Sequence, residues 1–119
     1  HGLNVTITGQ VFANGGGGGA GKPTNVFQGL AGADGTRSTV ASAAGGAPQD
    51  NEGAGGIGGR QGTNPQPGLR PTNSGTSTAG AGGGSVGFIQ TYTPAGVTPT
   101  LTPTAASPAV EPNRTLPTR

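Results

Sequence analysis

Glycine recurs at every third position in several stretches of this chain. The runs fall at 15, 18 and 21; at 29, 32 and 35; at 53, 56, 59 and 62; at 80 and 83; and at 84 and 87. Period three is the period of the extended left-handed polyproline-II-type helix, and glycine on one edge lets another backbone pack closely there. We therefore predict polyglycine-II-like segments between residues 15 and 87, although a chain this rich in glycine also produces some such runs by chance.

Large apolar side chains are too few for an ordinary core. Leu, Ile, Val and Phe together number 18 of 119 residues, against 27 glycines and 11 prolines. So little apolar surface does not offset the entropy of ordering the backbone, and glycine loses more entropy than any other residue. Either the chain is a disordered linker, or its order comes from backbone hydrogen bonds, which we expect to be made with neighbouring chains of a fibre or larger assembly.

Two stretches show the pattern of β-strands. In residues 3–13 most apolar side chains share one face, and Phe12 falls on the other, polar one; the residues of the apolar face are Leu3, Val5, Ile7, Val11 and Ala13. This alternation predicts a strand, and the β-forming run SVGFIQTY at 85–92 predicts a second one. The expected fold class is mainly β and extended, without significant helix. The two strands flank the polyglycine-II-like segments, and a proline-rich C-terminal arm follows them.

The last segment has regularly spaced prolines, at 94, 99, 103, 108, 112 and 117. The pattern repeats every nine residues, which corresponds to three turns of polyproline II, and such a chain is extended and stiff. We therefore divide the chain into a glycine-rich domain, 1–92, and an extended Pro/Thr-rich arm, 93–119. We interpret the arm as a linker or as a connector laid along a neighbouring subunit.

The charge pattern, the absence of Cys and the first residue of the chain narrow the partners and the location that we expect. Six Lys and Arg and four Asp and Glu give a net charge of +2, and the basic residues are scattered singly, whereas nucleic-acid binders cluster them. No apolar run is long enough to span a membrane. The absence of Cys excludes a disulfide framework. The chain begins with His1, which we interpret as cleavage from a secreted precursor. We therefore expect an extracellular or cell-surface location and neither nucleic acid nor a membrane span.

One motif suggests nucleotide binding. Residues 16–22, GGGGAGK, fit G-x-x-x-x-G-K and follow the strand predicted at 3–13, as a phosphate-binding loop does. However, Pro23 stands where Ser or Thr would hold Mg²⁺, and residues 24–35 lack a helical apolar period. We attribute the match to chance among consecutive glycines and predict no bound nucleotide.

Other chemical sites are incomplete. His1 is the only histidine, so a copper site made of the terminal amine and two histidines lacks one ligand. GLAGADGTR at 29–37 fits the calcium repeat only in part, and Asp50 and Glu52 are interpreted as a solvated acidic turn. The carboxylates have no evident rigid scaffold that would fix a catalytic pair. We predict no enzyme activity, no cofactor and no metal.

The glycine-edged middle and the run NVTITGQVFANGGGGG at 4–19 resemble glycine-rich secreted and cell-surface bacterial proteins. Over about residues 1–90 the chain is also similar to the polyglycine-II sandwiches of phage tail-fibre tip adhesins and of glycine-rich antifreeze proteins. The long interruptions and the proline-rich tail depart from the antifreeze pattern. The likeness lies in composition and spacing, so it assigns no binding residue.

These features favour a non-enzymatic structural subunit of an extracellular filament or surface assembly, made of copies of this chain. Unpaired strands are templates for other chains, and head-to-tail contacts that do not close produce filaments. The alternative is an adhesin or fibre-tip module that contacts glycans, cell surfaces or other surface proteins; the absence of Trp argues against it. The candidate interface residues are Leu3, Val5, Ile7, Val11, Val86, Phe88, Ile89, Tyr92, Leu101 and Val110.

Overall fold

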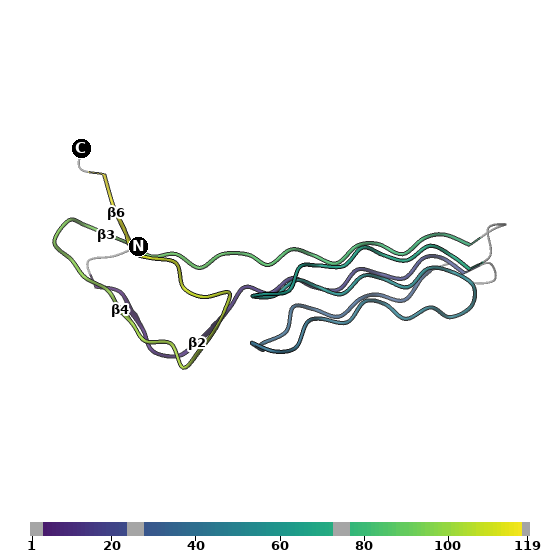
Figure 1. Ribbon diagram of the computed structural model, residues 1–119, viewed down its shortest axis with the longest axis horizontal. Coiled ribbons are helices and arrows are strands. Elements are labelled where there is room, and N and C mark those ends of the chain that lie inside the picture. The colour runs from purple at the N-terminus through teal and green to yellow at the C-terminus, as the bar shows by residue number, and fades with distance from the viewer. Residues whose placement is uncertain (1–3, 24–27, 73–76, 118–119) are drawn as a thin grey trace.

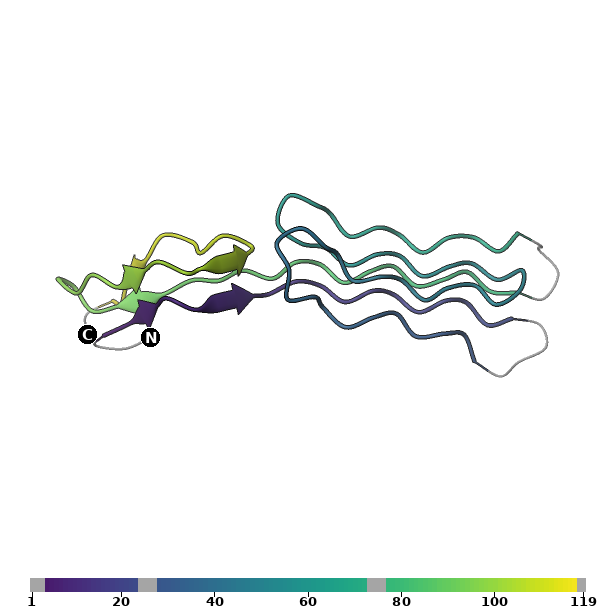
Figure 2. The same cartoon turned by 90° about the horizontal axis from the view of Figure 1, so that it is seen from below.

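The chain forms an elongated body whose two ends are built differently (Figure 1). In this computed structural model, residues 4–23, 28–72 and 77–117 are described. The principal extents are 63, 31 and 22 Å. The strands labelled in Figure 1 gather at one end, and extended segments run lengthwise and side by side through the other (Figure 2).

The strand end contains short strands paired in parallel. They are β1 (Thr6–Ile7), β2 (Gln10–Phe12), β3 (Tyr92–Thr93), β4 (Thr100–Leu101), β5 (Ala105–Ser107) and β6 (Arg114–Thr115). They form three two-stranded sheets, β1–β4, β2–β5 and β3–β6. Ile7 lies opposite Leu101, and Tyr92 lies opposite Arg114. With no helix in the described residues and only these small sheets, the mainly β and extended class is confirmed.

The predicted strands differ in extent from the observed ones. The stretch predicted at 3–13 contains β1 and β2, with Thr8 and Gly9 between them. The strand predicted at 85–92 is displaced toward the C-terminus, since β3 starts at Tyr92 and Ile89 makes only an isolated bridge to Val110. The reason is that the preceding residues belong to the glycine-rich end; Gly87, for example, donates its N–H to the carbonyl of Ala13 at 2.7 Å.

The proline-rich tail lies along its own chain. Residues 100–107 pair with residues 5–13, and residues 110–116 pair with residues 89–93. The N–H groups of Thr100, Thr102 and Thr104 donate to the carbonyls of Val5, Ile7 and Gly9 at 2.9, 2.8 and 3.1 Å. The sequence suggested a linker or a connector to a neighbouring subunit, but the tail finds its acceptors within the same chain. The boundary placed between residues 92 and 93 falls inside β3.

The other end is a bundle held together by its backbone. Its extended segments are residues 14–22, 28–35, 41–47, 53–59, 65–70 and 78–87. Segments 14–22 and 53–59 are central, because each is hydrogen-bonded to four of the others. The sequence led us to expect such pairing between neighbouring chains, whereas here it is made within one chain.

Within a segment, residues three apart share the same partner. One edge of segment 14–22 donates to segment 53–59, a second donates to segment 28–35, and the third accepts from segment 78–87. On the first edge, the N–H groups of Gly15, Gly18 and Gly21 donate to the carbonyls of Gly59, Gly56 and Gly53 at 2.9, 2.8 and 2.9 Å. The hydrogen bonds therefore have the same period as glycine has in the sequence.

Close backbone approach explains most glycines of the bundle. At 17 of the 25 described glycines, an added Cβ would lie within 3 Å of backbone atoms of another segment. These include every member of the runs at 15–21, 29–35, 53–59 and 80–83. Gly62, which also fits the period, is different: it has a φ of 72° and open space around it, so it serves a turn. Any side chain at the 17 positions would push two backbones apart.

The interior contains very little apolar material. Among the described residues, Ala43 is the only buried hydrophobic one, whereas Glu52, Thr91, Thr93 and Ser107 are buried polar ones. The hydroxyls of the buried Thr91, Thr93 and Ser107 are paired, whereas the buried Ser42 Oγ has no partner among the described residues. Thr93 Oγ1 donates to the Val97 carbonyl at 2.8 Å and accepts from Asn113 Nδ2 at 2.8 Å. The fold thus depends on hydrogen bonds more than on apolar burial, as the composition predicts.

Candidate functional surfaces

The predicted interface residues gather around the strand end. Leu3 lies outside the described residues. The half-buried ones are Val5, Ile7, Val11, Val86, Ile89, Leu101 and Val110. The pairing brings two couples together, since Ile7 lies opposite Leu101 and Ile89 opposite Val110. Because directly paired residues share a face of a sheet, these couples cover each other within the chain.

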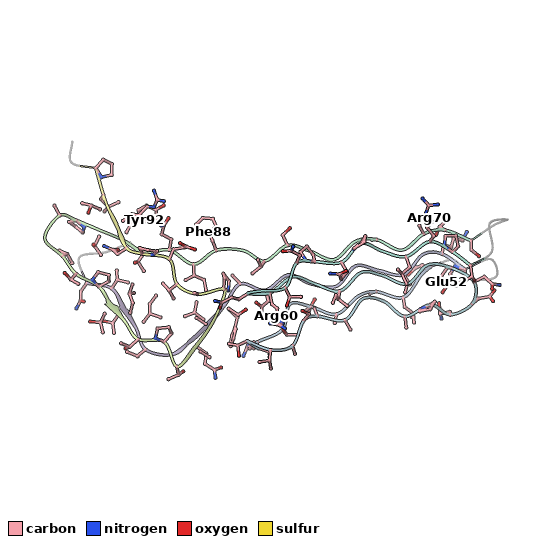
Figure 3. All side chains as sticks on the ribbon, viewed as in Figure 1. Glu52, Arg60, Arg70, Phe88 and Tyr92 are labelled. Carbon is pink, nitrogen blue, oxygen red and sulfur yellow. The ribbon has the colours of Figure 1, made fainter. Side chains whose placement is uncertain are left out.

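Phe88 and Tyr92 are the exposed members of the predicted set. Their exposed fractions are 74% and 38%. Figure 3 shows both side chains at the strand end, along the same stretch of chain. The Tyr92 hydroxyl donates to Gln90 Oε1 at 2.8 Å. Phe88 and Tyr92 therefore offer aromatic surface to solvent or to a partner.

The strand edge formed by the tail is interrupted by proline. Thr100, Thr102 and Thr104 direct their N–H groups inward, toward residues 5–9. Backbone groups alternate in direction along a strand, so Pro99 and Pro103 occupy outward positions. Proline has no N–H to donate, and this arrangement blunts an edge against further pairing.

The edge of residues 4–13 has no such block. Val5, Ile7 and Gly9 use their carbonyls for the tail, which leaves the intervening residues directed to the other side. Thr6 and Thr8 have exposed side chains, and the backbone of Thr8 makes no hydrogen bond with any described residue. Of the two outer edges of these paired strands, the edge of residues 4–13 is therefore the one open to a further strand.

A buried hydrogen-bond network joins the strand end to the bundle. Ser107 is fully buried; its Oγ donates to Asn14 Oδ1 at 2.6 Å and accepts from the Gln61 N–H at 3.2 Å. Asn14 Nδ2 in turn donates to the carbonyls of Thr36 and Ser38, both at 2.8 Å. Asn14 thus fixes the turn after segment 28–35 against strand β5.

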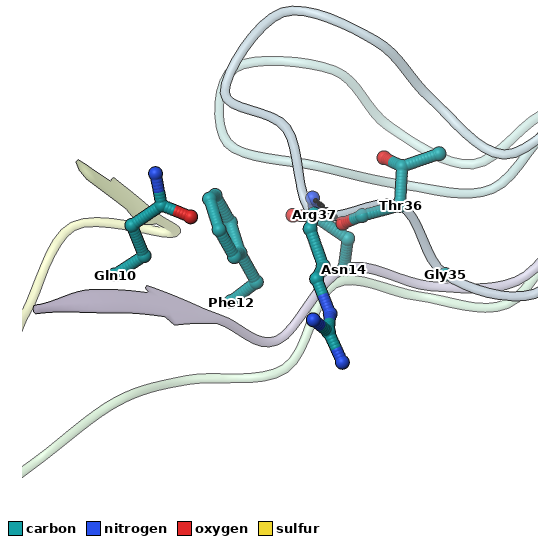
Figure 4. A pocket seen from close by; sticks show the side chains of 6 residues that line it. All are labelled: Gln10, Phe12, Asn14, Gly35, Thr36 and Arg37. Carbon is teal, nitrogen blue, oxygen red and sulfur yellow. Dashed lines mark hydrogen bonds between the residues drawn. The ribbon is translucent and has the colours of Figure 1, made fainter.

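A pocket opens beside this network. It has a volume of about 350 Å³ and is lined by Gln10, Phe12, Asn14, Gly35, Thr36 and Arg37. Figure 4 shows Gln10 and Phe12 next to each other on β2, with Arg37 on the facing turn. The sequence reasoning missed this site. One signal was available: Phe12 is the one aromatic residue on the otherwise polar face of the alternating segment.

The far end of the bundle carries a buried carboxylate. Glu52 is 3% exposed, and its carboxylate accepts hydrogen bonds from the N–H groups of Gln49 and, at 2.9 Å, Asp50. Burial raises the pKa of Glu52, but the backbone N–H groups of Gln49, Glu52 and Asp50 outweigh it and hold the pKa below its usual value. Glu52 therefore closes its own turn, where the sequence suggested a solvated acidic turn.

The glycine run that matches a phosphate-binding loop has a structural explanation. It lies in segment 14–22, whose three edges all bond to other segments.

Among the described residues, no group of three or more His, Asp or Glu side chains is placed to hold a metal ion. A helix long and apolar enough to cross a membrane is likewise absent from the described part.

Comparison with known proteins gives no relative. No protein-family model, no curated protein and no solved structure matches this chain.

Proposed function

We propose that the chain is a non-enzymatic structural subunit of an extracellular filament or surface assembly, built on a polyglycine-II bundle. The hydrogen bonding of residues three apart, repeated across the segments of the bundle, carries this proposal. A helix of this type has three residues per turn and satisfies none of its own backbone groups, so it needs neighbours on each edge. The six segments supply those neighbours to one another.

Such a bundle suits a mechanical role. Its segments run lengthwise through one end of a body 63 Å long and are cross-linked at intervals of three residues. Because the interior is backbone, nearly all side chains face outward and are free to vary or to make contacts. A stiff body with a polar surface is appropriate for a spacer or filament subunit at a cell surface.

The contact between copies falls to the strand end. In this proposal residues 100–107 of the arm seal one edge of the strands, and the prolines at 99 and 103 keep that edge from pairing further. The open edge of residues 4–13 then accepts a strand from the next copy. Phe88 and Tyr92 add exposed aromatic surface nearby. The added strand must come from a surface other than residues 4–13 of the next copy, because only such a head-to-tail contact does not close and produces a filament.

Electron microscopy of the purified chain, at the concentration at which it is isolated, tests this proposal. We expect filaments with a regular subunit repeat for the wild type and for Thr8→Ala. We expect only monomers for Thr8→Pro, because proline removes the outward N–H that the next copy needs. Circular dichroism of the Pro variant should match the wild type. A wild-type chain that stays monomeric and ordered at high concentration would refute the proposal.

A second candidate function is an adhesin or fibre-tip module that contacts glycans or cell surfaces. The pocket beside β2 favours it, since the pocket combines an aromatic ring, an amide and a guanidinium group in one hollow. A glycan-binding panel tests this candidate directly. Binding confined to variants with an intact pocket would support it, and no binding to any glycan in the panel would count against it.

A further inference from the structure

We propose that the pocket beside β2 binds a carboxylated sugar unit of a polysaccharide, a hexuronate. This inference rests on the second candidate function, the glycan-contacting module, and does not require the chain to polymerise. The pocket volume of about 350 Å³ lies at the lower end of the range for small-molecule sites, about 300–1,000 Å³. A pocket of this size fits one or two sugar rings of a longer chain.

The lining groups match the parts of a hexuronate. The Phe12 ring supplies a flat apolar surface against which the C–H face of a sugar packs. The Gln10 amide offers both a donor and an acceptor for ring hydroxyls. The Arg37 guanidinium pairs with a carboxylate through two parallel N–H···O hydrogen bonds, the geometry in which arginine is strongest. All three residues line the pocket, and in Figure 4 the Gln10 amide and the Arg37 guanidinium lie on opposite sides of the Phe12 ring.

These three side chains are uncommitted. Neither the Gln10 amide nor the Arg37 guanidinium makes a hydrogen bond to a described residue, and both residues are exposed. Asp34, three residues before Arg37, forms no ion pair with it in the described structure. The pocket therefore carries one positive charge that the protein does not neutralise. A ligand with a single negative charge and several hydroxyls complements it.

The pocket is also held open by its surroundings. Asn14 Nδ2 holds the backbone at Thr36 and Ser38, and Thr36 Oγ1 donates to the Ala41 carbonyl at 2.6 Å. Arg60 Nη1 donates to the Thr39 carbonyl at 3.1 Å, which ties the same turn to the bundle. Because the turn that carries Arg37 is fixed before binding, less entropy is lost when the ligand arrives.

Titration followed by amide NMR spectra tests the inference. The probe is tri-galacturonate, with tri-galactose and tri-glutamate as comparisons. We expect tri-galacturonate to shift the signals of residues 10–12 and 35–37, with a dissociation constant of about 1 mM. Arg37→Gln should weaken this binding by about tenfold or more, because a charge-assisted hydrogen bond is lost. Phe12→Leu should weaken it as well.

The matched control is Arg70→Gln. Arg70 is also an exposed arginine, but it lies at the far end of the bundle (Figure 3), so its loss should leave binding unchanged. Four outcomes would overturn the inference: no shifts at about 10 mM, ten times the expected dissociation constant; equal binding of tri-galactose; equal binding of tri-glutamate; or equal losses in the two arginine variants. Light scattering of the same samples reports assembly separately, so the failure of one proposal is distinguishable from the failure of the other.

Discussion

Replacing one central glycine by alanine should destabilise the bundle strongly. Gly56 lies in the central segment 53–59, donates its N–H to the Ala81 carbonyl and accepts from the Gly18 N–H, both at 2.8 Å. A Cβ at this position would lie 2.8 Å from the carbonyl carbons of Gln66 and Pro67 and closer still to the Gln66 oxygen. These are backbone atoms, which cannot turn away as a flexible side chain would.

The cost follows from the displacement that this Cβ requires. Ordinary contact begins at 3.4 Å, so segment 65–70 would have to retreat by roughly 1 Å or more. The bonds from Gln66 N–H to Ile57 and from Leu69 N–H to Ala54, now 3.0 and 2.8 Å, would then lie outside hydrogen-bonding range. Two lost backbone bonds at about 1–2 kcal/mol each, with overpacking of about 1–3 kcal/mol, give roughly 3–7 kcal/mol.

Gly82→Ala is the matched control, because it lies in the same bundle and is the same substitution. The nearest atom to a Cβ there is the Gln66 oxygen at 3.8 Å, an ordinary contact. Alanine restricts the unfolded chain, so Gly82→Ala should be neutral or should stabilise by about 0.4–1 kcal/mol. Urea unfolding followed by circular dichroism measures both variants in terms of the free energy of unfolding.

The difference in the free energy of unfolding between Gly56→Ala and Gly82→Ala tests whether close backbone approach is what requires glycine. A loss of roughly 3–7 kcal/mol is a large part of the stability of a typical domain, about 5–15 kcal/mol, so Gly56→Ala should unfold at much lower urea concentration. If both variants unfold within about 0.5 kcal/mol of each other, close backbone approach is not what requires glycine in segment 53–59.

Two further predictions concern buried polar groups. Because its folded pKa is lowered, Glu52 stabilises the protein fully above the ordinary carboxyl pKa of 4.5, and this contribution is lost as the pH falls through the folded pKa. Thermal melts between pH 7 and pH 2 should therefore show a smaller loss of stability on acidification for Glu52→Gln than for the wild type. Ser107→Ala leaves Asn14 Oδ1 and the Gln61 N–H without their partner, and calorimetry should show a loss of about 1–3 kcal/mol.

The spacing of glycine was the most informative part of the sequence. The predicted runs at 15–21, 29–35, 53–59 and 80–83 are places where backbones approach too closely for a Cβ. The alternation in residues 3–13 likewise placed Ile7 and Val11 on the more buried face and Thr6 and Thr8 on the exposed one. Both patterns are local, because each reflects the repeat of one extended segment.

The pairing partners were not predictable in the same way. The periodicity of a segment predicts which of its edges lacks side chains, but it does not predict which distant segment forms hydrogen bonds with that edge. For this reason the tail was interpreted as a linker or as a connector to a neighbouring subunit. Proline at 99 and 103, next to threonines that donate inward, is compatible with either choice. The pocket was missed for a related reason, since Phe12 and Arg37 are brought together only by the turn that Asn14 holds.

A fold held mainly by its backbone should have an unusual heat capacity of unfolding. An ordinary protein of 119 residues would show a ΔCp of about 1.4–1.8 kcal/mol/K, which arises chiefly from exposing apolar surface. Here Ala43 is the only buried hydrophobic residue among those described, and buried amides contribute to ΔCp with the opposite sign. We expect a ΔCp below about half of the ordinary value, and therefore a flat stability curve over temperature. Calorimetry at several pH values measures ΔCp as the slope of the unfolding enthalpy against the melting temperature. A slope in the ordinary range would mean that apolar burial, in this chain or between its copies, contributes far more than the backbone bonds suggest.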